Sequence, residues 1–186
     1  MEAELLRPDV EAEPIGQLAP RTDPAEADRL TSLYASAIYR LAVGLLNDAA
    51  LAEDVVQETL FRAWQHLDDL REPTFERAWV LRIAHNMAVT LGRRRRDVVT
   101  QPHEMPEQHT DLDPERIMIG RYDLSVVEAA LDELDDRSRS IVVLREVEQL
   151  PIAEIAAIVG LPEPATRTRL FRARAKLKET VLGGPR

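Results

Sequence analysis

The stretch LPIAEIAAIVGLPEPATRTRLFRARAKL, residues 150–177, decides the fold of this chain. Its first part places Ile152, Ile155 and Val159 at helical spacing, and Gly160 then suits a left-handed turn. Pro164 can begin a second helix, because its missing N–H would have no partner in the first turn. A short helix, a tight turn and a longer helix follow one another as in a helix-turn-helix.

The second helix of this unit is strongly basic. Helical geometry places four residues on its inward face, namely Thr166, Leu170, Ala173 and Leu177. The rest of its circumference holds six cations, which are Arg167, Arg169, Arg172, Arg174, Lys176 and Lys178. We expect no intrahelical salt bridges, because no acidic residue follows any of these cations at i+4. The pattern therefore favours a face that binds phosphate over a merely solvated face.

The position of each residue along this helix predicts its contact with DNA. The front of the second helix of a helix-turn-helix enters the major groove. Arg167, Thr168 and Arg169 are thus expected to reach base edges, with Arg172 nearby. Residues further along are expected to face phosphates, and these are Arg174, Lys176 and Lys178.

Charge is unevenly distributed along the chain, whose formal net charge is -9. Residues 71–97 hold seven cations and three acids, and residues 163–178 hold six cations and one acid. Residues 1–70 and 101–136 are acidic. Two basic segments in an acidic background predict two separate contacts with nucleic acid.

Composition narrows the class of protein. The chain has 186 residues and no cysteine, which excludes disulfides, thiolate metal sites and cysteine nucleophiles. The acidic start MEAELLRPDVEAEP does not resemble a secretory signal, and apolar runs such as LAVGLL at 41–46 are too short to cross a bilayer. We expect a cytoplasmic protein.

Periodicity predicts an all-α fold with two small helical domains joined by a flexible acidic linker. Residues 1–22 are interpreted as a disordered N-terminal tail, 23–97 as the first domain, 98–122 as a proline-containing linker and 123–183 as the second domain. The expected helices span residues 24–46, 49–67, 75–96, 124–134, 137–147, 152–159 and 164–181.

The first expected helix has clear limits and one apolar side. Asp23 is a plausible cap with Pro24 behind it, and Asn47 and Asp48 break the helix. Its apolar face is expected to comprise Leu30, Leu33, Tyr34, Ala37, Ile38, Leu41 and Leu45.

The string AEDVVQETLFRAW, residues 52–64, predicts a second helix with a polar strip. Val55, Leu60 and Trp64 are expected to pack inward. The strip on the other side comprises Asp54, Gln57, Glu58 and Arg62. Such a strip suits docking on a helix of another protein, and a solvated face is the alternative.

The third expected helix and the loop before it offer groups that can hold unstacked bases. They combine aromatic surface, charge and an amide, in Phe75, Trp79, Arg82 and Asn86. Trp79 and Ile83 can instead belong to the core. The run Arg93–Arg96 suits phosphate binding, although a basic helix end also complements the helix dipole.

EDVVQETLFRAW, then ERAWVLRIAHNMAVTLGRRRR, and then the helix-turn-helix with RTRLFRARAKL resemble the extracytoplasmic-function group of sigma factors of bacterial RNA polymerase, in the sigma-70 family. The resemblance covers residues 24–97 and 123–182 in the family's order of region 2 and region 4. It implies a factor that binds core polymerase, recognises the minus-10 and minus-35 promoter elements and directs initiation, in a stress or envelope response.

The resemblance also implies a role for each matching position. Core polymerase, through the clamp helices of its beta-prime subunit, would be bound by Asp54, Gln57, Glu58, Phe61 and Arg62. Minus-10 DNA would be bound and melted by Thr74, Phe75, Arg77, Trp79, Arg82, Asn86, Arg93, Arg94, Arg95 and Arg96. Minus-35 DNA would be read by Thr166, Arg167, Thr168, Arg169, Arg172, Arg174 and Lys176.

The implied partners are core polymerase, including its beta flap, promoter DNA, and an anti-sigma factor anchored in the membrane. Neither a cofactor nor a small-molecule substrate is implied, and outside these complexes the chain is expected to be a monomer. The sequence also departs from the family's common run EGTVKSRL at Pro164 and at Arg167, which we interpret as replacing an apolar residue. These departures weaken any transfer of minus-35 sequence preference.

Three alternatives compete with this interpretation. A helix-turn-helix regulator that binds DNA without polymerase would need no polar DxxQE strip. A sigma-like decoy for an inhibitor would need no basic helix. An enzyme lacks support, since His103 and His109 with Glu104 and Glu107 stand in a proline-broken segment with no metal or catalytic spacing.

Overall fold

The computed structural model describes residues 23–70, 72–99 and 129–183. The predicted tail at 1–22 and nearly all of the predicted linker at 98–122 lie outside this part, and the domain limits stay predictions. Within the described ranges every regular element is a helix, which confirms the all-α prediction. None of these helices is both long enough and apolar enough to span a membrane.

Helix α2, Pro24–Leu46, begins and ends where the sequence predicts. Asp23 caps it by accepting a hydrogen bond from the Ala25 N–H at 2.9 Å. At the other end Asn47 adopts a left-handed conformation with φ 47, and its N–H donates to the Val43 carbonyl at 2.8 Å. Short side chains that tolerate this conformation end helices in this way.

Asp48 then caps helix α3, Ala49–Gln65, by accepting from the Leu51 N–H at 3.1 Å. Two short 3-10 helices follow, η1 at Leu67–Asp69 and η2 at Pro73–Phe75. They lead into helix α4, Glu76–Val99. Helix α3 thus ends two residues before the predicted limit, because the chain tightens into η1 there.

Helices α2, α3 and α4 form the first domain and pack on one another. The apolar face predicted for α2 is largely confirmed, since Leu30, Ile38 and Leu41 are fully buried. Leu33 is an exception, with 57% of its surface exposed, so its assignment to this face is wrong. It stands at the edge of the apolar stripe, where neither neighbouring helix covers it.

The second domain contains helices α6, Asp136–Glu146, α7, Ile152–Val159, and α8, Glu163–Gly183. Residues 129–132 before it are helical, and the rest of the helix expected at 124–134 lies outside the described part. Gly160 ends α7 in the left-handed conformation with φ 66, as predicted. The helix-turn-helix is therefore formed by α7 and α8.

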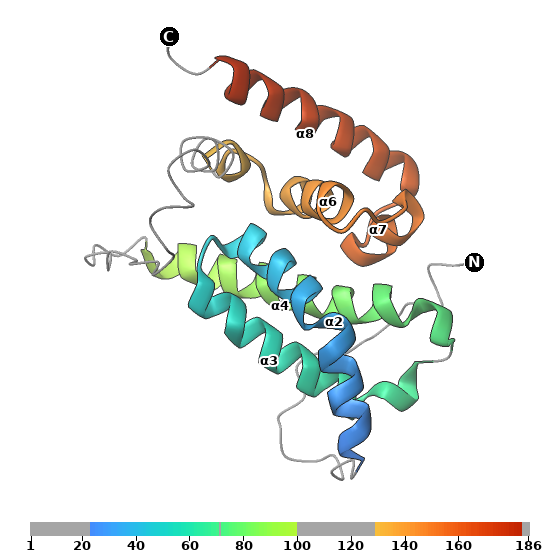
Figure 1. Ribbon diagram of the computed structural model, residues 1–186. Helices are drawn as coiled ribbons and strands as arrows, with labels where there is room; N and C mark the ends of the chain where they lie inside the picture. Colours follow the sequence, from blue (N-terminus) through green and yellow to red (C-terminus); the bar gives the residue numbers. More distant parts are fainter. Residues whose placement is uncertain (1–22, 71, 100–128, 184–186) are drawn as a thin grey trace, which may run out of the picture.

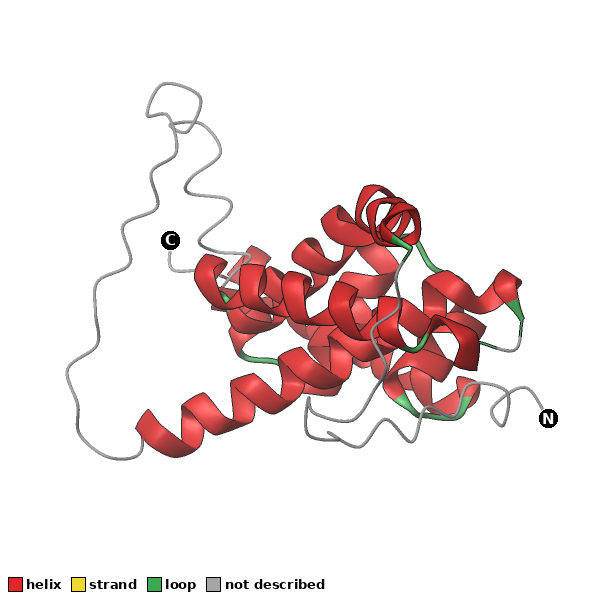
Figure 2. Cartoon of the chain, turned by 90° about the horizontal axis from the view of Figure 1, so that it is seen from below, coloured by secondary structure: helices red, strands yellow, loops and turns green. Residues whose placement is uncertain are grey.

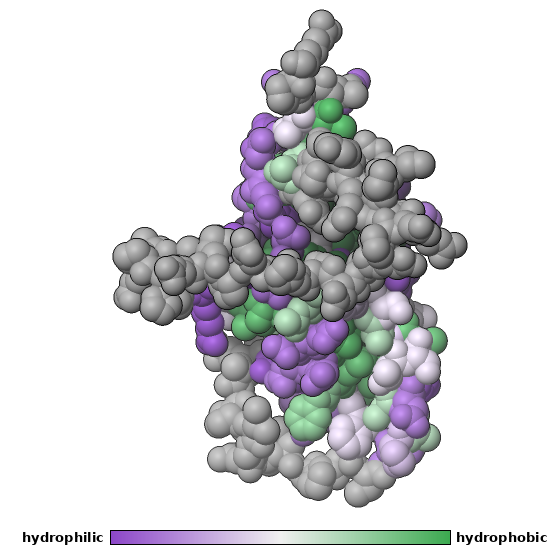
Figure 3. Space-filling model, turned by 60° about the vertical axis from the view of Figure 1, so that its left-hand side comes forward, coloured by the Kyte–Doolittle hydropathy of each residue, from purple (hydrophilic) through white to green (hydrophobic). Residues whose placement is uncertain are grey.

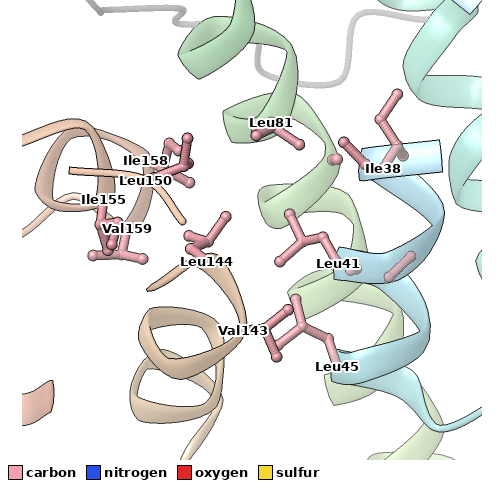
Figure 4. Close-up of a cluster of buried hydrophobic side chains, with 14 of the residues drawn as sticks. Ile38, Leu41, Leu45, Leu81, Val143, Leu144, Leu150, Ile155, Ile158 and Val159 are labelled. Carbon is pink, nitrogen blue, oxygen red and sulfur yellow. The ribbon is translucent and has the colours of Figure 1, made fainter. Parts of the chain in front are cut away.

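The two domains lie directly against each other (Figure 1), and in the view from below (Figure 2) the helices again form one body. Helix α2 packs on α6, and α4 packs on α7. Their buried side chains form one hydrophobic cluster that runs through both domains. In Figure 4, Leu41 and Leu45 from α2 face Val143 and Leu144 from α6.

Candidate nucleic-acid and polymerase interface

The polar strip on α3 is displayed as the sequence predicts. Asp54 and Gln57 are exposed. Glu58 is half-buried and accepts a hydrogen bond from Arg62 Nε at 2.7 Å, which joins the two in an i,i+4 ion pair. Phe61 is 38% exposed, and its ring centroid lies 6.4 Å from that of Trp64. The strip offers charge, an amide and an aromatic edge on one helix face.

A groove of about 530 Å³ runs beside this strip between α2 and α3. Its lining includes Gln57 and Glu53 from α3 and Tyr39 and Arg40 from α2. The strip and the groove are therefore continuous through Gln57. A helix of another protein that docks on the strip would also cover the groove.

Helix α4 is fixed at its start by a buried acidic group. Glu76, whose side chain is 11% exposed, accepts two hydrogen bonds from the Arg29 guanidinium, each at 2.8 Å. The Tyr34 hydroxyl donates a third at 2.6 Å. The Arg29 hydrogen bonds lower the pKa of Glu76, and burial raises the pKa of Tyr34 to about 12. This network ties α4 to α2 next to the residues assigned to minus-10 DNA.

Glu76→Gln is expected to lower the free energy of unfolding by about 1–3 kcal/mol at pH 7. The substitution removes the negative charge of the carboxylate that accepts two hydrogen bonds from the Arg29 guanidinium. The folded-state pKa of Glu76 lies below its unfolded value, so the contribution is present above about pH 4.3 and is lost as the pH falls through the folded pKa. Urea denaturation at pH 7 and pH 3 measures both effects. A gap between wild type and variant that does not narrow at pH 3 would contradict this assignment.

The residues expected to hold unstacked bases differ in exposure. Thr74 and Asn86 are exposed, and Phe75 and Arg82 are half-buried. Trp79 is only 5% exposed and Ile83 6%, so both belong to the core, which was the alternative that the sequence left open. The Trp79 ring offers no surface to a base in this arrangement.

The cations of α4 are mostly paired. Arg77 donates to Glu148 at 3.1 Å, Arg95 to Asp48 at 2.9 Å, and Arg96 to Asp136 at 2.6 and 2.9 Å. Arg93 lies 3.8 Å from the Asp136 carboxylate. Arg94 is exposed and makes no hydrogen bond or ion pair with any described residue. Arg94 is thus the most available phosphate-binding group of the run.

Helix α8 presents the faces that the sequence predicts. Leu170 and Ala173 are 5% and 2% exposed, and Leu177 is half-buried. Thr166 is fully buried and donates to the Pro162 carbonyl at 3.1 Å, so its hydroxyl is not offered to DNA. The side chain of Arg167 is 66% exposed, so the interpretation that it replaces an apolar residue is wrong. The inward position is that of Thr166, one residue earlier.

The prediction that α8 has no intrahelical salt bridge is also wrong. Arg167 pairs with Glu163, four residues earlier, at 2.6 Å. The expectation rested on acids that follow the cations at i+4, whereas Glu163 precedes Arg167 by one turn.

Other cations of α8 pair across the domain. Arg169 lies 3.2 Å from both Asp135 oxygens, Arg174 donates to Glu146 at 2.8 Å, and Lys176 reaches Glu133. Burial alone would raise the pKa of Asp135, but hydrogen bonds from Ser138 and the charge of Arg169 lower it. Arg172 and Lys178 are exposed and make no hydrogen bond or ion pair with any described residue.

A groove of about 610 Å³ separates α8 from the segment before α6. Thr168, Arg169, Arg172 and Lys176 line it on the α8 side. On the face seen in Figure 3, hydrophilic residues form a column over the upper part of the molecule and a second group below it. Three of the cations expected to read DNA, Arg169, Arg172 and Lys176, therefore line one groove.

Phe171 is an exposed aromatic residue that is not among the functional residues predicted from the sequence. It is 76% exposed and stands between the cations of α8. An aromatic ring on such a helix can contact the methyl group of thymine. The exposure of Phe171 could have been predicted from the sequence, since Phe171 falls outside the apolar face formed by Leu170 and Ala173.

The described residues do not support a metal site. They contain no group of three or more side chains suited to holding a metal ion. His103 and His109 lie outside the described part, so the structure does not address them.

Two family models match the segments that contain the α3 strip and the helix-turn-helix. The family model "Sigma-70 region 2" matches residues 30–98, and "Sigma-70, region 4" matches residues 124–177. The first match contains α3 and nearly all of α4, and the second contains α6, α7 and most of α8.

Curated proteins match along most of the chain. The ECF RNA polymerase sigma factor SigL of Mycobacterium tuberculosis is 36% identical over 167 residues, covering 84% of this chain and 91% of SigL. The RNA polymerase sigma factor CnrH of Cupriavidus metallidurans is 34% identical over 182 residues, covering 83% of this chain and 94% of CnrH.

Solved structures match in fold. The sigma factor RpoE, in complex with the anti-sigma factor NepR from Bartonella quintana, superposes with a TM-score of 0.69 at 26% identity, over 87% of this chain and 99% of RpoE. CnrH in complex with the cytosolic domain of CnrY gives a TM-score of 0.66 at 28% identity, over 88% of this chain and 92% of CnrH. The exposed strip on α3, the basic helix-turn-helix and these matches together place the chain in the extracytoplasmic-function group of the sigma-70 family.

Proposed function

We propose that this chain is a sigma factor that binds core RNA polymerase, recognises minus-10 and minus-35 promoter elements and directs the start of transcription. The observation that carries the proposal is that one chain holds both matched regions in order, with the α3 strip exposed in the first and the cations of α8 displayed in the second. A regulator that binds DNA by itself would need only the second.

The docking face in this proposal is the strip Asp54, Gln57, Glu58, Phe61 and Arg62, which would meet the clamp helices of the beta-prime subunit. Its support is geometric: Asp54 and Gln57 project from α3 next to an aromatic residue and an ion pair. Exposed polar groups around an aromatic anchor are typical of a protein-docking surface. The second domain would meet the beta flap and minus-35 DNA.

An anti-sigma factor anchored in the membrane is the proposed regulator. RpoE, which shares this fold, was solved with the anti-sigma factor NepR, and CnrH, which also shares it, was solved with the cytosolic domain of CnrY. The chain is proposed to act in the cytoplasm, as a monomer outside these complexes, without a cofactor or an enzymatic activity of its own. A stress or envelope signal would release it.

Transcription in vitro tests the proposal. A promoter is first selected from a random-sequence library with purified core polymerase and the wild-type chain, and transcripts are then counted with and without the chain. Transcripts that start at the selected site only with the chain are expected. Selection of a DNA site without any initiation would favour a DNA-binding regulator instead.

Asp54→Ala/Gln57→Ala is expected to reduce these transcripts several-fold at limiting core polymerase, because each lost hydrogen bond at the docking face costs about 1 kcal/mol. Affinity for core polymerase, measured by fluorescence anisotropy, should fall by the same factor. Asp28→Ala is the matched control, because Asp28 is an exposed acid on α2 that lies outside both the strip and the lining of the neighbouring groove. An equal loss in the control would remove the docking assignment from Asp54 and Gln57.

A further inference from the structure

His85 on α4 is a buried titratable residue that none of the roles above uses. It is 6% exposed and stands directly before Asn86, the exposed amide residue assigned to minus-10 DNA. Its Nδ1 lies 3.2 Å from Asn86 Oδ1, which is within hydrogen-bond distance for a ring nitrogen. Its Nε2 is buried and has no hydrogen-bond partner among the described residues. The two ring nitrogens therefore have different surroundings.

These surroundings select one tautomer of the His85 ring. The Asn86 oxygen can only accept, so Nδ1, which faces it, carries the proton and donates. In the reverse arrangement the Asn86 NH2 group would donate to a bare Nδ1, and the ring proton would then sit on Nε2. That buried N–H would have no acceptor among the described residues, at the cost of an unmade hydrogen bond. The tautomer with its proton on Nδ1 avoids this cost.

His85 is neutral near pH 7 in this position. Burial lowers its pKa below the usual value, and the positive charges of Arg137 on α6 and Arg82 on α4 act in the same direction. The hydrogen bond with Asn86 and the charge of Asp136 oppose this shift, but the effect of burial is the largest. The neutral ring with one donor, Nδ1–H, is therefore the form that meets Asn86.

The hydrogen bond from His85 decides what the Asn86 amide offers to a base. A free asparagine amide presents a donor and an acceptor together, which matches the N6 and N7 groups of adenine. Here the oxygen is engaged by the His85 ring, and the NH2 group on the other side of the amide makes no hydrogen bond with any described residue. Asn86 thus offers a donor. Its complement is a base with a keto oxygen, thymine O4 or guanine O6, rather than an amino group.

We propose that His85 is a positioning residue for minus-10 recognition, whose Nδ1–H holds the Asn86 oxygen so that the Asn86 NH2 group donates to a keto oxygen of an unstacked base. The proposal rests on the proposed function, in which Asn86 contacts the minus-10 strand. His85 touches no base and acts only through Asn86. The two residues are consecutive on α4 (Figure 1), so their contact lies within a single helix.

Base preference of the holoenzyme tests the proposal. The selected promoter, with its minus-10 segment pre-opened, is varied one base at a time, and affinity is measured by fluorescence anisotropy. Asn86→Ala identifies the position that Asn86 reads, because the preference among bases should be lost only there. At that position the wild-type chain is expected to prefer thymine or guanine over adenine or cytosine. The opposite preference would overturn the proposal.

Substitutions of His85 test its part in this preference. His85→Phe keeps a buried ring but removes the donor, and it is expected to reduce the preference at the Asn86 position about fivefold, the equivalent of one neutral hydrogen bond. Preferences at the other positions should not change. His85→Asn is the matched variant, because its NH2 group can replace Nδ1–H, and it should retain most of the preference. An equal loss from both variants would overturn the role of the donor.

A double-mutant cycle separates positioning from an effect on the fold. If His85 acts through Asn86, His85→Phe should change no preference further when Asn86 is already alanine. The same loss in both backgrounds would overturn the proposal. Each preference is a ratio of affinities within one variant, so it does not depend on the fraction of that variant that folds. His85→Leu, with a smaller side chain, makes the same test where the phenylalanine ring does not fit.

Two further results separate this proposal from the proposed function. If the chain starts transcripts but Asn86→Ala alters no base preference, the role of His85 falls while the sigma-factor function stands. If the wild-type chain starts no transcripts with core polymerase, the proposed function itself is overturned.

Discussion

Leu30→Ala is expected to lower the free energy of unfolding by about 2–5 kcal/mol, the largest effect among the substitutions considered. Leu30 is fully buried in α2, where the first domain has its core. Its truncation removes apolar contact and leaves a cavity that the three packed helices can fill only in part. Total stabilities of small proteins are about 5–15 kcal/mol, so the loss is a large share.

Urea denaturation followed by circular dichroism measures this loss, and Leu33→Ala is the matched control. Leu33 lies on the same helix three residues later but is 57% exposed. Its replacement should change the free energy of unfolding by no more than about 0.5 kcal/mol. Equal losses for the two variants would mean that the packing of α2 differs from the arrangement in Figure 1.

Arg172→Ala is expected to weaken binding to the selected minus-35 element by about 1–3 kcal/mol, or roughly 5–150-fold. Arg172 lines the groove beside α8, and it is exposed without an ion pair to any described residue. Arg169 and Arg174 must first give up Asp135 and Glu146 before they bind DNA. The unpaired guanidinium should therefore contribute most.

Fluorescence anisotropy with the holoenzyme, on the selected duplex and on one with a scrambled minus-35 segment, measures the effect. Arg172→Ala should reduce the difference between the two duplexes. Arg94→Ala should instead weaken both equally and flatten the salt dependence, because Arg94 is proposed to contact only phosphate. A uniform loss from Arg172→Ala would show that it, too, contacts only the backbone.

Much of the candidate site could be predicted from local sequence. The i, i+3, i+4 pattern placed Asp54 and Gln57 outward on α3, and Leu170 and Ala173 inward on α8, because helical geometry alone sets those directions. The exposure of residues near the edge of a face could not be predicted in the same way. Leu33 on α2 is exposed and Trp79 on α4 is buried. This difference depends on which parts of α2 and α4 are covered by the helices α3, α6 and α7 that pack on them.

The sequence by itself determined where α2 begins and ends, where α3 begins and where α7 ends. Asp23, Asn47, Asp48 and Gly160 act on backbone groups a few residues away, so their effect is fixed by their neighbours in the chain. The tertiary structure alone decided which charges meet. Arg40 and Glu148 are 108 positions apart, and only the packing of α2 and α4 on α6 and α7 brings such residues within hydrogen-bond distance.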